Sequence, residues 1–233
     1  MDTELIKISQ RKSAKIAGIV YPLSMIIVMV SNLLIVAPII VKGNLLETAK
    51  NILSHELSFR IGMTGNILYC VLTVVLLVAL YAILKHVNKN LALFAAICLL
   101  INGITWLLIA LNQYTVLRLL IDADFSQAFG QERLYALMKL HLGGQDAYYI
   151  GLLFWALSST IGSYLWFKSR YIPKSLAVIG VVSSAWCLLC TIIYYLNPNF
   201  ADLVNLDWFD SPMVLFELAL SLWLLFKGLR LSD

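Results

Sequence analysis

The sequence predicts an all-α polytopic membrane protein with six transmembrane helices and both termini in the cytoplasm. Of its 233 residues, 61% are apolar and 13% are charged, whereas an ordinary soluble domain has roughly 45–50% apolar and about 25% charged residues. A soluble fold of this length cannot bury such an apolar excess. Composition therefore excludes a soluble enzyme, a disordered chain and a secreted disulfide scaffold. We expect residues 1–233 to form a single integral membrane domain.

Six stretches are long enough to cross a bilayer as helices, which takes about 20 predominantly apolar residues each. They cover about residues 14–41, 61–84, 91–111, 148–167, 173–196 and 212–229. Pro22 and Pro38 predict bends in the first helix, where neighbouring helices can satisfy the freed carbonyl groups. Pro173 and Pro212 are expected at helix starts, where a missing N–H costs nothing.

Lys and Arg residues in the connections predict how the helices are oriented. Eleven of the 17 lie at the termini and in the second-to-third and fourth-to-fifth connections, and six lie on the opposite side. This asymmetry places both termini in the cytoplasm. The outer connections are longer, and residues 44–59 and 122–142 have the apolar spacing of helices that lie in the membrane interface. We therefore expect the function on the outer side.

Polar side chains inside a bilayer are costly, so they mark packing contacts or functional sites. In this orientation every predicted helix contributes polar residues to its outer half, whereas the inner halves are nearly all apolar. This distribution predicts an outward-facing polar cavity that binds a lipid or another amphipathic small molecule, with Arg60 against an anionic head group. The candidate ligand-binding residues are Arg60, Asn66, Asn112, Gln113 and Tyr148.

Glu217 is the deepest carboxyl group of the predicted helices. A charge at mid-bilayer costs on the order of 2.5–3.5 kcal/mol, so we expect Glu217 to face the bundle and to be protonated or paired with Arg60 or His141. A structural ion pair, a ligand or catalytic site, and simple exposure remain open. In the catalytic alternative, an enzyme acts on lipid or peptide at the outer leaflet. His141 is then the general base and Glu217 or Asp146 orients it.

A small transporter is a third possible function. The apolar inner halves provide no polar path, and no inverted repeat is visible, so neither feature favours it. No zinc-ligand spacing, haem-ligand pattern, serine-hydrolase motif or nucleotide-binding glycine pattern occurs, and the cofactor stays unknown. No basic stripe with interleaved aromatic residues predicts nucleic-acid binding. We expect membrane lipids as partners, with a homo-oligomer or a partner membrane protein also possible.

Several other residues have structural interpretations. Cys187 and Cys190 form a C-x-x-C pattern, which redox enzymes use, but they lie in an apolar run where cysteine behaves as a small hydrophobic residue. Trp155 is assigned with other aromatic residues to the belts at the membrane interfaces. Ser159 and Ser163 are small residues four positions apart, a spacing that favours close helix contact.

Short stretches across residues 12–228 carry a resemblance to a known family. They are Ala17–Tyr21, Phe59–Gly62, Val87–Leu93, Ile150–Phe154, Tyr171–Leu176 and Leu222–Gly228, with His141, Gly144 and Glu217. In these stretches the chain resembles a bacterial family of six-helix membrane proteins catalogued as domain of unknown function 4386. The resemblance implies a six-helix fold and a multi-pass protein of the bacterial cytoplasmic membrane, and it implies no substrate. Where the family reads His-Gly-Tyr, this chain departs from it between His141 and Asp146.

Overall fold

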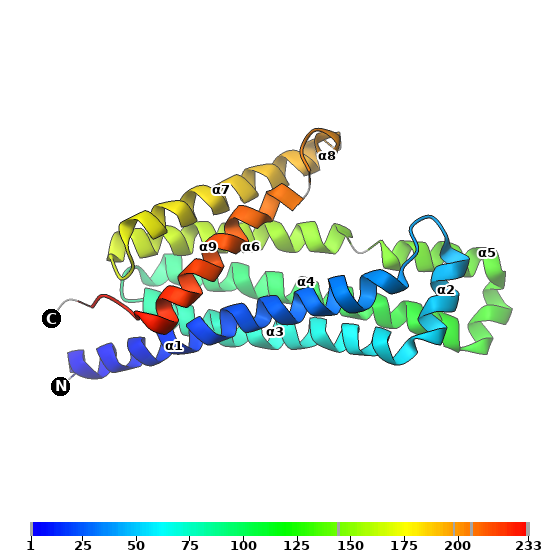
Figure 1. Cartoon of the computed structure of the whole chain (residues 1–233), viewed down its shortest axis with the longest axis horizontal. Helices are drawn as coiled ribbons and strands as arrows, with labels where there is room; N and C mark the ends of the chain where they lie inside the picture. Colours follow the sequence, from blue (N-terminus) through cyan, green and yellow to red (C-terminus); the bar gives the residue numbers. More distant parts are fainter. Residues whose placement is uncertain (1, 144, 198, 206, 232–233) are drawn as a thin grey trace. The chain divides into compact units, whose positions relative to one another are not determined.

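The structure is a computed structural model that describes residues 2–143, 145–197, 199–205 and 207–231. The side chains of residues 2–3, 123–129, 145–146, 201–202 and 207 lie outside this description. Within the described residues the chain is helical and contains no strand (Figure 1). Six helices are long and apolar enough to cross a membrane. The predicted all-α class and the predicted number of spans are therefore confirmed.

The helices follow one another in the order labelled in Figure 1, with two irregular segments after the first. They are α1 (Asp2–Met29), the π-helical η1 (Val30–Val36), the 3₁₀ turn η2 (Ala37–Ile39), α2 (Leu45–Ser54), α3 (Glu56–Leu84), α4 (Lys89–Ile121), α5 (Ala123–Leu142), α6 (Gln145–Ser169), α7 (Lys174–Leu196), α8 (Phe200–Leu203) and α9 (Asp207–Phe226). The helix over 45–54 and the helix over 123–142 confirm that the two long connections predicted on the outer side are helical.

The last long helix begins at Asp207, five residues before the predicted start at Pro212, and that prediction is wrong. A proline inside a helix leaves the carbonyl group four residues earlier without its usual donor. Here this is the carbonyl group of Trp208, which accepts a 3.0 Å hydrogen bond from Nε1 of Trp186 in α7. The indole of a neighbouring helix thus replaces the missing N–H, and the helix can continue through Pro212.

The chain divides into two compact units. Unit 1 consists of Met1–Leu23, Leu72–Gly103 and Tyr149–Asp233, and unit 2 consists of Ser24–Val71 and Ile104–Tyr148. All eleven basic residues of the predicted cytoplasmic side belong to unit 1, and the other six belong to unit 2. The charge asymmetry that predicts the orientation thus coincides with the division between the two units.

Unit 1 is held together by close contacts between helix backbones. α7 and α9 lie side by side (Figure 1). Gly18 of α1 lies so near α9 that an added Cβ would be 2.8 Å from the backbone nitrogen of Leu225. At Gly180 of α7 an added Cβ would meet the ring of Phe216 and the hydroxyl group of Ser163. Such small residues allow helices to approach closely in membranes, and the expected packing role of Ser163 is confirmed.

Unit 2 has its own apolar core, to which both irregular segments and the short helix α2 contribute. Its buried side chains include Val36, Ile39, Ile52, Phe59, Leu117 and Met138. α2 begins with a side-chain cap, because Oδ1 of Asn44 accepts a 3.0 Å hydrogen bond from the backbone N–H of Glu47. This cap satisfies one of the free N–H groups at the helix start, and the buried face of α2 then packs on the core.

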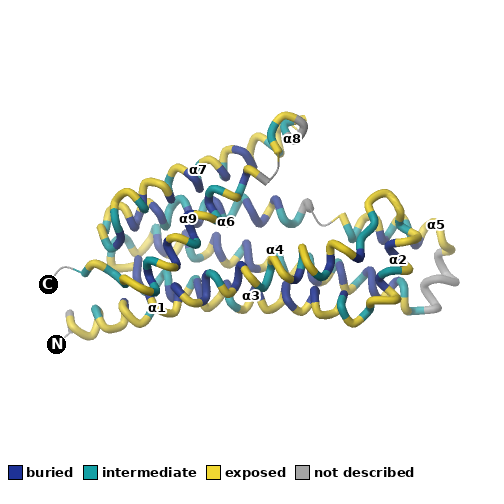
Figure 2. Tube along the Cα trace, viewed as in Figure 1, coloured by how far each residue is buried: buried dark blue, intermediate teal, exposed yellow. Residues whose placement is uncertain are grey.

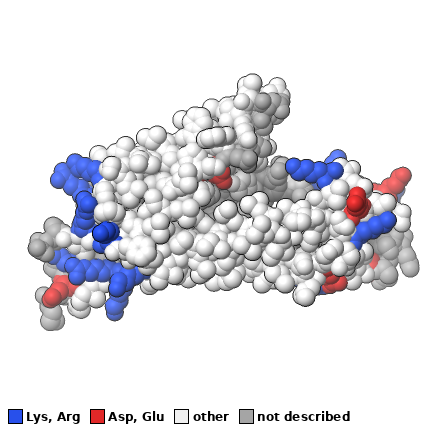
Figure 3. Space-filling view, in the orientation of Figure 1, with Lys and Arg blue, Asp and Glu red and all other residues white. Residues whose placement is uncertain are grey.

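The long helices have one packed face and one outer face, so that buried and exposed residues alternate along them (Figure 2). The outer faces carry large exposed apolar residues, such as Ile67, Val78, Val182 and Leu215. In unit 1, Lys and Arg side chains gather where α1 begins and α9 ends, and few charged atoms appear along these helices (Figure 3). An apolar outer surface with charges at the helix ends fits a multi-pass membrane protein.

Candidate functional site

Glu217, in the middle of α9, has a side chain that is fully buried in unit 1. Among the described residues it is the one buried Asp, Glu, Lys or Arg. Its Oε1 accepts a 2.9 Å hydrogen bond from Nε1 of Trp155 in α6. The side chain thus faces the bundle as predicted, and its partner is an indole N–H of the same unit.

The remaining contacts of this carboxyl group are hydroxyl groups. The side chains of Ser159 in α6 and Tyr21 in α1 lie within hydrogen-bonding reach of Glu217. Oε2, however, has no well-aligned hydrogen-bond partner among the described residues. Buried polar atoms in proteins nearly always have such a partner. Oε2 of Glu217 is therefore an acceptor whose capacity the described part of the chain does not use.

A cavity of about 30 Å³ lies next to this carboxyl group in unit 1. Three residues that contact Glu217, namely Tyr21, Trp155 and Ser159, also line the cavity, so the carboxyl group lies directly behind its wall. α1, α3, α4, α6 and α9 all contribute to the lining. A water molecule occupies roughly 10–15 Å³ by this measure, so the cavity has room for about two.

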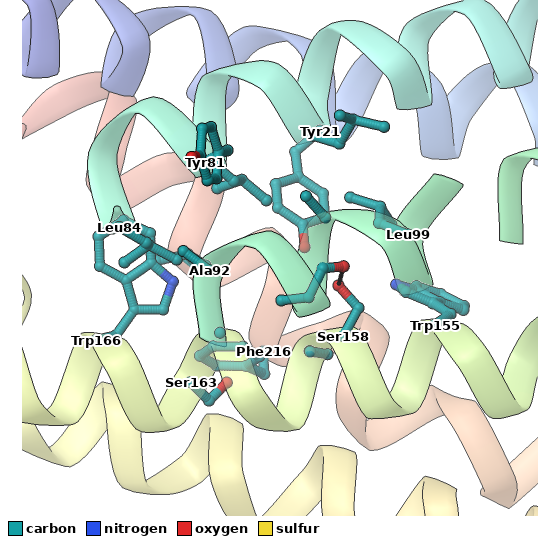
Figure 4. A pocket seen from close by; sticks show the side chains of 17 residues that line it. Tyr21, Tyr81, Leu84, Ala92, Leu99, Trp155, Ser158, Ser163, Trp166 and Phe216 are labelled. Atoms are coloured by element: carbon teal, nitrogen blue, oxygen red, sulfur yellow. Dashed lines mark hydrogen bonds between the residues drawn. The ribbon is translucent and has the colours of Figure 1, made fainter. Parts of the chain in front are cut away.

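The wall of the cavity combines hydroxyl groups with aromatic rings. Figure 4 shows the side chains of Tyr21, Ser158 and Ser163 among the rings of Phe216 and Trp166. Ser158 uses its hydroxyl group to donate a 2.8 Å hydrogen bond to the carbonyl oxygen of Ala95. Oγ of Ser163 is buried and has no hydrogen-bond partner among the described residues. One lining hydroxyl group is thus available to a bound molecule.

The cavity lies in the part of the helices where the sequence predicted almost no polar groups. Ser158, Ser159 and Ser163 belong to the second half of α6, and Leu84 and Ala92 flank the connection between α3 and α4. By charge, this connection is predicted to be cytoplasmic. The expectation of nearly apolar inner halves is wrong for α6, because three serines lie in this half of the helix, where their hydroxyl groups are buried between helices.

Sequence reasoning misses the roles of four members of this site. The aromatic pattern predicts an interfacial belt position for Trp155, but this residue contacts Glu217 in the middle of the helix. The spacing of Ser159 and Ser163 predicts packing alone, and no sequence feature singles out Tyr21. A visible signal was the cluster of Ser158, Ser159 and Ser163 within two turns of an otherwise apolar helix, because serine is a costly choice in a lipid-facing position.

A second polar cluster links three elements of unit 2. Nδ2 of Asn32 in η1 donates to Oδ1 of Asn66 in α3 at 2.7 Å, and Nδ2 of Asn66 donates to Oε1 of Gln113 in α4 at 3.0 Å. Asn66 and Gln113 are buried. The structure therefore brings these two predicted ligand-binding residues together. They bind each other, as a chain of amides that holds three helices in register.

The other predicted site residues lie apart from this chain of amides. Nδ1 of His141 lies 3.0 Å from Oδ1 of Asn112, and the ring nitrogen is the donor because an amide oxygen only accepts. Arg60 forms an exposed ion pair with Glu56 at 2.7 Å. Tyr148 packs edge-on against Trp106, with ring centroids 5.9 Å apart. The side chain of Asp146 lies outside the described residues.

These positions show which partner each predicted site residue has in the structure. His141 belongs to unit 2 and Glu217 to unit 1, and each has a partner inside its own unit. Nδ1 of His141 is held by the amide of Asn112, and the side chain of Asp146, which is expected to orient His141 in the catalytic alternative, lies outside the described residues. Arg60 is paired at the surface of unit 2, and exposed pairs of this kind contribute about 0–1 kcal/mol.

The site does not resemble a metal centre. In the part of the chain that the structure describes, no three His, Cys, Asp or Glu side chains are placed to hold a metal ion. Cys70, Cys98, Cys187 and Cys190 are free and buried. The immediate partners of Glu217 are hydroxyl groups and an indole, and the thiol of Cys187 and the carboxyl group of Asp210 are near enough to interact with it electrostatically.

Comparison with known proteins identifies a family and no closer relative. No curated protein matches the chain, and no solved structure does. The family model described as "Domain of unknown function (DUF4386)" matches residues 16–228. This range includes every residue that lines the cavity, and it confirms the resemblance found in the sequence. The chain therefore belongs to the DUF4386 family.

Proposed function

We propose that this protein binds a small amphipathic molecule in the cavity beside Glu217, within the cytoplasmic membrane. The observation that carries the proposal is a pair of buried oxygen atoms without a partner among the described residues. One is Oγ of Ser163, which lines the cavity, and the other is Oε2 of Glu217, whose neighbours Tyr21, Trp155 and Ser159 line it. A buried polar group without a partner costs about 1–3 kcal/mol. A bound polar group that satisfies these atoms offsets this cost, which gives the site affinity.

The rest of the wall favours a molecule with an apolar part. Leu77, Leu80, Leu99 and Leu220 line the cavity together with small alanines. Leu77 and Leu80 are half-buried, so the wall formed by α3 is partly open. Ligand sites in proteins typically combine such an apolar lining with a few polar groups that fix orientation. A polar end at Ser163 with an apolar chain along α3 uses both parts of the wall.

Gly162 provides a direct test, because it lines the cavity and an added Cβ there meets no atom within 4 Å. Gly162→Leu fills the cavity without a clash. Ala219→Leu adds the same side chain to an exposed position of α9 and is the matched control. Native mass spectrometry is performed on the purified protein after incubation with octylamine, 1-octanol or octanoate.

We expect at least one of these amphiphiles to remain bound to the wild type and to Ala219→Leu, and to be lost from Gly162→Leu. Retention in Gly162→Leu means that the amphiphile binds elsewhere, and absence of any bound amphiphile from the wild type means that the cavity is not a ligand site. Either result overturns the proposal.

A further inference from the structure

We propose that the ligand of this cavity is a primary aliphatic amine, which binds as the ammonium ion through Ser163 with Glu217 as its counter-charge. This inference rests on the proposed function and specifies the chemistry of the polar end. Three features of the site select this class: the sign of the charge that the wall accepts, its aromatic lining and its volume.

The sign of the charge follows from the residues around the cavity. None of the 17 lining residues is a Lys, Arg or His, and a carboxyl group lies behind the wall. Nζ of Lys85 lies outside the lining, 5.9 Å from the ring centroid of the lining residue Tyr81. An anionic head group would enter a site beside Glu217 whose own lining holds no cation, and such burial is unfavourable. A cation gains attraction from the same carboxyl group, because Coulomb interactions are strong where water is excluded. Phosphate and carboxylate ligands are therefore disfavoured.

The hydrogen-bonding capacity of the site also suits a donor, because an ionised carboxylate only accepts and a serine hydroxyl group can accept as well as donate. Oγ of Ser163 has no partner, and Nε1 of Trp155 is already used by Oε1 of Glu217. An ammonium group carries three donors and no acceptor, so it complements these oxygen atoms. The aromatic rings of Trp155, Trp166 and Phe216 line the same space (Figure 4). Aromatic rings add favourable interactions with cations, most of all where water is excluded.

The volume separates primary amines from larger cations. The cavity of about 30 Å³ has room for about two water molecules. An ammonium group at the end of a chain is close to a water molecule in size, whereas a trimethylammonium group is several times larger. The apolar chain then leaves along the half-buried leucines of α3. The site thus fits a primary amine and excludes a quaternary one.

The test compares four amphiphiles with the same octyl chain: octylamine, octyltrimethylammonium, 1-octanol and octanoate. Their binding to the full chain is measured by native mass spectrometry and by tryptophan fluorescence in nanodiscs of zwitterionic lipid, with protein-free nanodiscs as the correction for partition. The variants are Glu217→Gln, Ser163→Ala and, as matched control, Glu132→Gln. Glu132 is exposed in unit 2 and does not line this cavity, so its substitution removes a carboxylate without changing the cavity wall.

We expect octylamine to bind the wild type at least about tenfold more tightly than 1-octanol, and octyltrimethylammonium and octanoate not to bind. Glu217→Gln should remove the preference for octylamine but keep the binding of 1-octanol, and Ser163→Ala should weaken octylamine. Glu132→Gln should match the wild type.

Two other results have distinct meanings. If 1-octanol or octanoate binds as well as octylamine, and Gly162→Leu still blocks it, the inference is wrong and the proposed function stands. If none of the four amphiphiles binds, the proposed function fails as well. The comparison of amphiphiles on the wild type decides the question even where Glu217→Gln does not fold.

Discussion

Nε1 of Trp155 donates a 2.9 Å hydrogen bond to Oε1 of Glu217, and this bond joins α6 to α9 inside unit 1. Both residues lie near the middle of their helices. A carboxyl group at such a depth is expensive unless it has partners. The indole therefore does more than fill space, because it holds one oxygen of the carboxyl group in place, whereas the other has no partner among the described residues.

Replacement of Trp155 by Phe should destabilise the protein. The ring remains, but Oε1 of Glu217 loses its donor, which costs about 1–2 kcal/mol for a buried hydrogen bond in a membrane protein. The measurement is chemical unfolding in detergent micelles. Trp208→Phe is the control, because the ring of Trp208 is 63% exposed and only its backbone carbonyl group is used. Equal stability of the two variants would contradict the role given to this bond.

Gly18→Ala should loosen the contact between α1 and α9. The new Cβ would lie 2.8 Å from the backbone nitrogen of Leu225 and 3.0 Å from the carbonyl oxygen of Ser221. Backbone atoms cannot move aside as side chains do, and overpacking of this kind costs about 1–3 kcal/mol. Gly162→Ala is the control, because its Cβ meets no atom within 4 Å. It should stabilise the protein by about 0.5–1 kcal/mol through helix propensity, so thermal unfolding should shift in opposite directions.

Asn66→Leu should break the chain of amides in unit 2. It removes both the acceptor of Asn32 and the donor to Gln113, and we expect a loss of about 1–3 kcal/mol because two partners are left unsatisfied. Thr64→Ala is the control, since the exposed Thr64 bonds only to the carbonyl group of Arg60 in its own helix. Binding of octylamine in unit 1 should persist in Asn66→Leu, and its loss would show that the two units act as one site.

The charge distribution predicts that both termini are cytoplasmic and that α2 lies on the opposite side. The four native cysteines are buried, so single cysteines at exposed positions can be labelled selectively. Lys12→Cys and Lys227→Cys should be protected from an impermeant maleimide in intact cells, whereas Lys50→Cys should react. Different labelling at Lys12→Cys and Lys227→Cys would contradict an even number of spans, and equal labelling at all three positions would contradict the placement of α2 on the opposite side.

The architecture could be predicted because it depends on features that the sequence displays locally. Length and apolar content locate the six spans, and the apolar spacing of residues 44–59 predicts the helix that the structure shows as α2. The ends of the helices are harder to predict from the sequence. For example, α4 continues ten residues past Leu111, through polar residues that still form a helix. The tolerance of Pro212 depends on Trp186 in another helix, which no local pattern contains.

The site could be predicted only in part for the same reason. Glu217 is conspicuous because a carboxyl group in an apolar helix is rare. Its partners are not conspicuous, because tryptophan and serine are common in membrane helices for other reasons. Only the packing of α6 against α9 gives Trp155 and Ser163 this role. The pairing of Asn66 with Gln113 likewise depends on the approach of α3 to α4.

The contact of Gly18 with Leu225 also constrains how the protein is made. The first helix leaves the ribosome long before the last, and its glycine surface has no partner until α9 has entered the membrane. A nascent chain that stops after α7 lacks both this partner and the carboxyl group of Glu217. Unit 1 is therefore completed by its final helix. Truncated chains expose the surface of α1 that α9 otherwise covers, and membrane quality control can detect such a surface.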